Sequence, residues 1–417
     1  MKIICDRAAL LEAVNLVAAV VPARSPSPAL SCLKLTAARS AGVGSLTVSG
    51  TDAEVSLEVT LSQVDLQQPG VAVVSAEKIR QILQTVGETD PTVQVEVEGD
   101  SCQIRSTKSR FRIFVFPSGD FPPLPDYARV RASGAAGGGG EARALFTHPA
   151  GSLLKLVHRT AFATARETSR YAINGVLFRR DGRRLEMVAT DGRRLALCRT
   201  SIKGSDAGTA GGVGTGGAGG GGGGGGAVQC IIPSKALNLL TRLAGDPEEP
   251  VRIAVTDNRV FFGFDDGDGA QETGQPRAVL SSALVEGAFP PYEDVIPKEN
   301  DKKATAGRED LAAAVRQAAV LTNEESRGVR MHFSGKGRRV KLSSRAPEMG
   351  DSEIDLGLTE YAGDDLEICF NPHYLTDVLK TLDEDEVIVE LKASNKPGLI
   401  RVGTDFLYVL MPVNLPA

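Results

Sequence analysis

Alternating apolar and polar positions mark a strand–turn–strand pattern that returns along the chain. Residues 44–59 (GSLTVSGTDAEVSLEV) and 183–197 (RRLEMVATDGRRLAL) each give an alternating run, a Thr-Asp pair and a second alternating run. Residues 338–356 keep the alternation but have lost the Thr-Asp pair. Period-two alternation places apolar side chains on one face of a strand, and Thr-Asp between two such runs indicates a β-hairpin. A module that returns roughly every 140 residues predicts one domain type repeated three times.

Stretches with helical spacing accompany each hairpin. Near residues 7–20, Leu10, Leu11, Val14 and Val17 follow the helical period, and Ser75 is a suitable N-cap for a second helix at about 75–86. Comparable pairs of candidate helices occur in the other two repeats, at 152–166 and 234–244 and at 307–321 and 371–382. Each repeat thus has two helices and about eight strands. The pattern predicts an α+β fold of three tandem domains, at residues 1–128, 129–297 and 298–417.

Two glycine-rich segments interrupt these patterns. Residues 132–140 (ASGAAGGGG) are expected to form a flexible linker. Residues 204–226 contain 15 glycines in 23 residues. A phosphate-binding loop needs glycines at fixed spacing and a Lys-Ser/Thr pair, which this segment lacks, so a disordered surface insertion is expected.

Composition narrows the class of protein. With 417 residues, 42% hydrophobic and 24% charged, the chain suits several globular domains. It has no run of about 18 apolar residues, so no membrane span is expected. Asp6 and Arg7 precede any apolar stretch, which argues against a signal peptide. Six scattered cysteines without a C-x-x-C pair favour reduced thiols in a cytoplasm. Four distant histidines predict no metal site, and no cofactor is expected.

The charge distribution is more informative than the net charge of −5. The candidate helices at 152–166 and 234–244 contain basic residues and no acidic ones. Such helices suggest a surface for phosphates, without a recognition helix or aromatic platform to read bases. An ordinary solvated face fits the same charges, and charge alone leaves both open. The basic positions are Lys155, Arg159, Arg166, Lys235 and Arg242.

Asp52 and Asp191 occupy equivalent turns and raise the alternative of an aspartic dyad. Aspartic proteases carry the order Asp-Thr/Ser-Gly, whereas this chain has Thr-Asp-Ala and Thr-Asp-Gly. Turn-capping aspartates are the simpler interpretation. No G-x-S-x-G, H-E-x-x-H or Walker motif and no Cys–His pairing appears. The chain is therefore not expected to be an enzyme.

Several motifs together resemble the bacterial sliding clamps, the beta subunits of the replicative DNA polymerase. They are MKIICDRAALLEAV, RYAINGVLF, VATDGRRLAL, FPPYEDVIP, NEESRGVR and YVLMPVNL. The resemblance covers the whole chain apart from the glycine-rich segments. It implies a head-to-tail homodimer of three-domain protomers that closes into a ring. Helices would line a hole for duplex DNA, sheets would form the outer wall, and the ring would tether the polymerase for processivity without any chemistry.

The resemblance also implies residues that contact DNA. Arg24 and Tyr171 match family positions that touch DNA, and Ala172 stands where some members have a second tyrosine, which weakens that contact. Lys155, Arg159, Arg166, Lys235 and Arg242 are added from helix phase and not from the family.

A second implied site is an apolar cleft that takes short peptide motifs from polymerases, the clamp loader and repair proteins. A Leu and a Phe of the peptide would bury apolar area while Arg194 and backbone groups orient it. Asp294 stands where some relatives carry arginine, and Pro416-Ala417 extend past the usual terminal leucine. The resemblance therefore leaves open which charge the rim of the cleft prefers and whether the two terminal residues crowd its edge. The cleft residues are Ile173, Thr190, Gly192, Arg193, Arg194, Leu195, Pro290, Val295, Pro397, Val409, Met411, Pro412 and Val413.

Ring closure is expected where Phe111 and Ile113, on a late edge strand of the first repeat, meet Val320 and Leu321 of the third. The main alternative is a monomeric repeat scaffold that binds peptides without encircling DNA. A hydrolase built on Asp52 and Asp191 is a third, more distant reading.

Overall fold

The computed structural model describes residues 1–22, 25–40, 42–62, 64–87, 90–135, 142–165, 171–202, 227–265, 276–322, 328–346 and 348–413. It divides into two compact units. Unit 1 comprises Met1–Leu154, Ile202–Val228 and Lys235–Leu284, and unit 2 comprises Lys155–Ser201, Gln229–Ser234 and Val285–Ala417.

The elements follow the three repeats. The first contains β1 (Lys2–Asp6), α1 (Arg7–Ala18), η1 (Pro28–Ser31), β2 (Cys32–Ser40), β3 (Val43–Thr51), β4 (Val55–Leu61), β5 (Asp65–Gln68), β6 (Gly70–Ser75), α2 (Ala76–Thr85), β7 (Thr92–Glu98), β8 (Ser101–Arg105), β9 (Arg110–Phe114) and η2 (Ser118–Asp120). The second contains α3 (Tyr127–Ala135), β10 (Ala144–Pro149), α4 (Ala150–Thr160), η3 (Ala161–Ala163), β11 (Gly175–Asp181), β12 (Arg184–Thr190), β13 (Arg194–Ser201), β14 (Val228–Pro233), α5 (Ser234–Leu240), β15 (Pro250–Val255), β16 (Arg259–Phe264), β17 (Ala278–Ala283) and η5 (Tyr292–Val295). The third contains β18 (Lys302–Gly307), α7 (Arg308–Ala319), β19 (Val329–Ser334), β20 (Arg339–Ala346), β21 (Gly350–Gly357), β22 (Glu360–Ala362), β23 (Leu366–Phe370), α8 (Pro372–Lys380), β24 (Glu386–Leu391), β25 (Gly398–Val402) and β26 (Phe406–Leu410).

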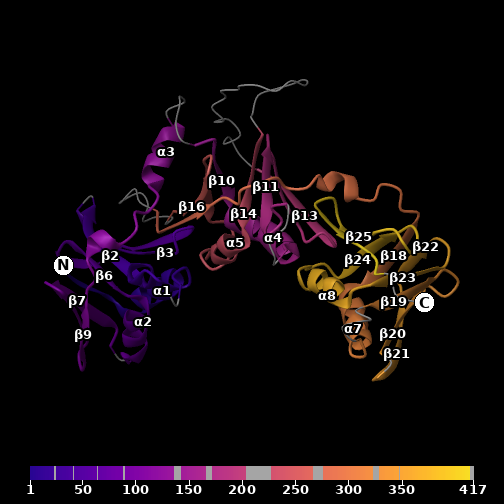
Figure 1. Cartoon of the computed structure of the whole chain (residues 1–417), viewed down its shortest axis with the longest axis horizontal. Helices are drawn as coiled ribbons and strands as arrows, with labels where there is room; N and C mark the ends of the chain where they lie inside the picture. Colours follow the sequence, from indigo (N-terminus) through magenta and orange to yellow (C-terminus); the bar gives the residue numbers. More distant parts are fainter. Residues whose placement is uncertain are drawn as a thin grey trace. The chain divides into compact units, whose positions relative to one another are not determined.

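The helices form as their sequences predict. In α1 the buried residues are Leu10, Ala13, Val14 and Val17, one stripe at helical spacing, and Asp6 caps the N-terminus by accepting from the Ala9 amide at 2.8 Å. In the first and third repeats the two helices pack on each other, α1 on α2 and α7 on α8 (Figure 1).

Two of the four sheets continue from one repeat into the next. In unit 1, the last strand of the second repeat, β17, pairs antiparallel with β4 of the first. In unit 2, the last strand of the third repeat, β26, pairs antiparallel with β13 of the second. We call these the first seam and the second seam. Both therefore join the last strand of one repeat to the strand after the hairpin of the preceding repeat.

The other two sheets end in open edges among the described residues. One has the order β5-β1-β7-β8-β9, and the other has the order β21-β20-β19-β23. Strand β9 is the last strand of the first repeat, and β21 is the strand after the hairpin of the third. These are the two kinds of strand that pair at the seams.

The structure corrects several sequence-based expectations. Helix α4 ends at Thr160 and a 3₁₀ turn follows, while the Thr160 hydroxyl bonds the Leu156 carbonyl at 2.7 Å. Helix α5 ends at Leu240, and beyond Thr241 the amides of Arg242 and Leu243 bond only three residues back, to Leu239 and Leu240. The expected linker begins in a helix, since α3 runs to Ala135. The predicted domain boundary after residue 128 also falls within α3. The glycine-rich segment 204–226 lies outside the described residues.

Candidate functional site

The turn between β12 and β13 explains the Thr-Asp-Gly sequence. The Thr190 hydroxyl donates to the Arg194 carbonyl at 2.6 Å, and Asp191 Oδ1 accepts from the Arg193 and Arg194 amides at 2.9 and 3.0 Å. Gly192 has a φ of +85°, in the left-handed region that favours glycine. The turn therefore holds the start of β13 in a fixed position beside β26.

The turn between β3 and β4 is held in the same way. Asp52 Oδ1 accepts from the Glu54 and Val55 amides at 3.0 and 2.7 Å, and its Oδ2 pairs with Lys235. Each aspartate is thus engaged by the backbone of its own turn. This supports the turn-capping interpretation over the aspartic dyad.

Arg194 is fixed from several directions within unit 2. It donates to Asp191 Oδ2 at 3.0 Å, to Asp377 Oδ2 at 2.7 Å and to the Phe162 carbonyl at 2.9 Å. Its guanidinium lies 4.4 Å from the centroid of the Tyr374 ring. Burial opposes its charge, but Asp377, Tyr408 and Asp191 outweigh that cost, so the pKa of Arg194 lies above its ordinary value. Because three of its five N–H donors are occupied, Arg194 chiefly shapes the wall beside it.

A cavity of about 240 Å³ opens at the second seam. The turn and β13 provide one part of its wall, and η5 with the prolines before it provides another. Leu195 and Val409 pair directly across the seam, and Met411 beside them keeps 44% of its surface exposed. The lining residues are Tyr171, Ile173, Thr190, Gly192, Arg193, Arg194, Leu195, Pro290, Pro291, Tyr292, Val295, Val409 and Met411.

Most of the predicted cleft residues come together in this cavity, and three do not. Pro397, Pro412 and Val413 are absent from its lining. The Val413 amide donates to the Cys369 carbonyl at 2.8 Å, which directs that end of the chain along β23. The lining adds Pro291 and Tyr292, which belong to the FPPYEDVIP motif, and Tyr171, which the family resemblance assigned to DNA. Pro416 and Ala417 lie outside the described residues.

The buried carboxylate of Glu186 anchors η5 to the sheet of unit 2. The Tyr292 hydroxyl donates to Glu186 at 2.5 Å, and Glu186 also accepts from Arg199 at 2.7 Å and from Arg184 at 2.9 Å. Burial alone would raise the pKa of Glu186, but these hydrogen bonds and the arginine charges outweigh it, and the pKa lies below its usual value. Because Tyr292 lines the cavity, Glu186 positions one of its walls. Sequence reasoning missed this pair, whose members are 106 residues apart.

Arg159 does not lie on the exposed face predicted from helix phase. Its residue surface is 2% exposed, and it donates to both carboxylate oxygens of Glu384, at 2.7 and 2.9 Å. Its guanidinium also lies 5.5 Å from the Phe406 ring centroid. The helix-phase prediction that Arg159 lies on an exposed face is therefore wrong. Lys155, one turn earlier in α4, is exposed as predicted.

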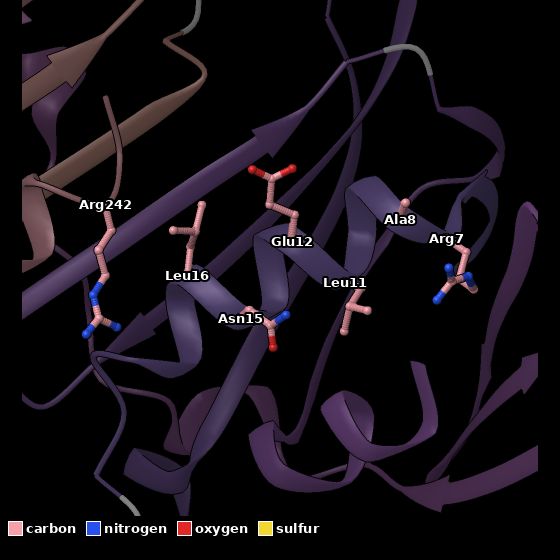
Figure 2. Close-up of a pocket in the computed structure, with 7 residues that line it drawn as sticks. All are labelled: Arg7, Ala8, Leu11, Glu12, Asn15, Leu16 and Arg242. Carbon is pink, nitrogen blue, oxygen red and sulfur yellow. The ribbon is translucent and has the colours of Figure 1, made fainter. Parts of the chain in front are cut away.

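Lys235 and Arg242 lie in unit 1 and differ in their partners. Lys235 of α5 forms an ion pair with Asp52 of the β3–β4 turn. The turn therefore partly neutralises a helix that has no acidic residue of its own. Arg242 lies beyond α5 and lines a pocket of about 360 Å³ along α1. Figure 2 shows Arg242 and Arg7 at opposite ends of that pocket, with Leu11, Asn15 and Leu16 of α1 between them. Arg24 and Arg166 lie outside the described residues.

The residues predicted for ring closure lie at the open edges. Phe111 and Ile113 are half-buried on β9, between the exposed Arg110, Arg112 and Phe114. Val320 follows α7 and is 72% exposed. Leu321 lies close to Gly350, where β21 begins.

Among the described residues, no group of three or more His, Cys, Asp or Glu residues is arranged to hold a metal ion. No described helix is long and apolar enough to cross a membrane. The six cysteines are buried, and burial raises the pKa of Cys198 and Cys369 to about 11.

Comparison with protein families gives three matches in chain order. Residues 1–125 match the N-terminal domain of the DNA polymerase III beta subunit, residues 148–211 its central domain and residues 293–414 its C-terminal domain. The three-domain clamp fold predicted from the sequence is therefore confirmed.

Relatives align over their whole length. The chain is 31% identical to the beta sliding clamp of Salmonella typhimurium and 30% identical to that of Escherichia coli strain K12, covering 100% of both chains. The crystal structure of the DNA polymerase III beta subunit from Pseudomonas aeruginosa superposes with a TM-score of 0.82 at 30% identity, again over 100% of both chains.

Proposed function

The chain belongs to the DNA polymerase III beta subunits, the bacterial sliding clamps, which are processivity factors and not enzymes, and on that premise we propose that two copies close into a ring around duplex DNA. The ring slides along DNA in the cytoplasm. It tethers the replicative polymerase, and the clamp loader and repair polymerases dock on the same ring.

The observation that carries ring closure is the repeated pairing of strands. Each seam joins the last strand of one repeat to the strand after the hairpin of another, and β9 and β21 are the two such strands left at sheet edges. An open edge is a template for pairing with another chain. Since the described part of the chain offers these two edges in complementary roles, β9 of one copy pairs with β21 of a second, and the same contact repeats around a two-fold axis.

The strand registers predict which residues meet at this third seam. The residues directly before the first helix of each repeat, Asp6, Pro149 and Gly307, are equivalent starting points. Following the strand pairings from them to the last strand of each repeat shows that Arg112 is equivalent to Ser281 and Val409. Aligning Arg338-Arg339 with Arg183-Arg184 in sequence places Arg345 at the position of Thr190, which is equivalent to Thr51. The strand partners of these three residues are Asp351, Leu195 and Ser56, so these are equivalent as well. Transferring the seam register places Arg112 opposite Asp351 and Arg110 opposite Glu353. These four residues are all exposed, so opposite charges would face each other across the joint.

Sliding requires weak phosphate contacts, because tight ones would hold the ring in place. Lys155 and Arg242 are exposed, while Lys235 is partly neutralised by Asp52. We propose Lys155, Lys235 and Arg242, with Arg24, Arg166 and Tyr171, as the sparse DNA contacts. Arg159 is not among them, because its ion pair with Glu384 commits its charge within the fold.

The experiment that tests the ring compares retention on two forms of one DNA after loading by the cognate clamp loader. The protein should stay on a nicked circle and run off the same DNA cut once. Equal, salt-dependent retention on both would mean ordinary phosphate binding and would end the ring proposal. The matched control is Phe111→Asp with Leu321→Asp, which places charges in the joint and should give monomers that neither DNA retains. A dimer mass for this variant would contradict the proposed joint.

The cavity at the second seam is proposed as the docking site for partner peptides. It is apolar, and Leu195, Val409 and Met411 offer the buried contact area from which peptide anchors gain affinity. Met411→Ala with Leu195→Ala should abolish binding of a Leu- and Phe-containing peptide, measured by fluorescence anisotropy, while the ring stays intact. Unchanged affinity would exclude the cavity as the docking site. It would also remove the binding site on which the alternative of a monomeric peptide-binding scaffold depends.

A further inference from the structure

Exposed charges of opposite sign lie on the two chain segments that form walls of the second-seam cavity, and we call these the rim charges. On the turn between β12 and β13, Arg193 is exposed and lines the cavity. On the η5 wall, Glu293 and Asp294 are exposed and directly precede the lining residue Val295. The two walls come from different segments of the chain, so the position of each charge is set by a different segment.

Most charged groups close to the cavity are already neutralised. Arg194 bonds Asp191 and Asp377, and Glu186 lies within its arginine cluster. Glu293 pairs with Arg179 at 3.2 Å. A ligand would have to break these contacts before it could use the same groups.

Arg193 and Asp294 are the exceptions. Within the described ranges, neither side chain has an ion-pair partner or a side-chain hydrogen bond. The Arg193 backbone is nevertheless fixed, since its amide donates to Asp191 at 2.9 Å and its carbonyl accepts from the Met411 amide at 2.9 Å. Its side chain therefore starts from a defined point beside the exposed Met411. Asp294 is likewise held between Tyr292, whose hydroxyl is anchored to Glu186, and Val295 in the cavity wall.

We propose that this cavity selects apolar segments of asymmetric charge, with an acidic residue flanking the anchors on the Arg193 side and a basic residue on the Asp294 side. The inference rests on the proposed docking function and adds the chemistry of the partner to it. Apolar anchors supply affinity, and the two rim charges fix the direction in which the segment lies. A segment in the reverse direction would place like charges together at both ends.

The test uses three synthetic peptides with one Leu- and Phe-containing core and different flanks. One has serines on both sides, one has aspartate before the core and lysine after it, and one has the reverse order. Fluorescence anisotropy at low salt should show one charged order binding about three- to tenfold tighter than the neutral peptide and the other weaker. The difference should shrink as salt screens the exposed pairs.

The decisive variant is Arg193→Glu with Asp294→Lys, which keeps net charge and exchanges the two rim charges. It should exchange the preference between the two charged peptides, so that the order that binds the unmodified protein more tightly binds this variant more weakly than the reverse order. The matched control is Lys336→Glu with Asp364→Lys, at exposed positions outside the cavity lining, which should leave all three affinities unchanged.

The outcomes separate the two proposals. If the neutral peptide binds but both charged orders match it, the charge inference is overturned and the docking site stands. If the neutral peptide fails to bind the unmodified protein, the docking proposal itself fails. A preference that survives the rim exchange would also overturn the inference, because other groups would then be reading the charge.

Discussion

The first and second seams share a backbone plan and differ in the side chains that meet across it. In both, an aspartate caps a tight turn and the following strand pairs with the last strand of another repeat. At equivalent register positions, Ser56 pairs with Ser281 in the first seam and Leu195 pairs with Val409 in the second. Two serines offer a partner little apolar area, whereas Leu and Val form part of a cavity wall. The repeated fold provides the position, and these substitutions provide the site.

The proposed third seam, between two copies of the chain, extends the comparison. At the positions of those serine and leucine–valine pairs, the transferred register would bring together the oppositely charged Arg112 and Asp351. A polar seam and an apolar seam join repeats within one chain. A charged seam suits a joint that must open for loading, because exposed ion pairs add specificity with modest stability.

Charge reversal at the third seam should have the largest effect. Arg110→Glu with Arg112→Glu would set like charges opposite Asp351 and Glu353 in both joints of the ring. At about 0.2–1 kcal/mol for each of four pairs, the dimer dissociation constant should rise by about fourfold to several hundredfold. Adding Asp351→Arg and Glu353→Arg to the same chain should restore it. Sedimentation equilibrium measures the dimer dissociation constant of both variants. If the four-residue variant does not regain the original value, the register transferred from the first two seams is wrong.

Removing the Glu186 charge should affect the second seam alone. Glu186 has a lowered pKa in the folded protein, so its stabilising contribution is present above the unfolded pKa and is lost as pH falls through the folded one. Glu186→Gln should therefore lower the free energy of urea unfolding by about 1–3 kcal/mol at neutral pH and by less in acid. The variant should also weaken peptide binding by loosening η5. An equal loss of stability at both pH values would show that the charge is not the cause.

The smallest expected effects are at the turns. Ala53 in the first seam has a φ of +80°, where the equivalent Gly192 of the second has +85°. A left-handed alanine costs about 1 kcal/mol, so Ala53→Gly should stabilise unit 1 and Gly192→Ala should destabilise unit 2 by similar amounts. Thermal unfolding of each single variant measures its change in stability relative to the unmodified protein. Shifts of the same sign would show that the turns are not equivalent.

Periodicity and turn chemistry predicted the repeated elements from the sequence, because these depend on neighbours within a few residues. Leu10, Val14 and Val17 mark α1 in this way, and Thr190 and Asp191 mark their turn. The family resemblance supplied the cleft, including Leu195, Val409 and Met411, which no local pattern distinguishes from core residues.

Contacts distant in sequence could not be predicted in the same way. Arg159 satisfied the phase of an exposed residue, yet its partner Glu384 is 225 residues away and draws it into the fold. The end of α5 at Leu240 placed Arg242 outside the helix from which its phase was counted. Tyr292 appeared as part of a motif, and only the fold brings Glu186 to its hydroxyl.

The most direct measurement of the central claim converts the second seam into the first. Leu195→Ser with Val409→Ser gives the second seam the serine pair of the first, with Ser56→Leu and Ser281→Val in unit 1 as the matched control. Anisotropy with the neutral peptide should show affinity falling at least thirtyfold for the serine variant, about 2 kcal/mol, and no change for the control. Full affinity in the serine variant, with its dimer mass intact, would contradict the claim that these side chains make the second seam a docking site.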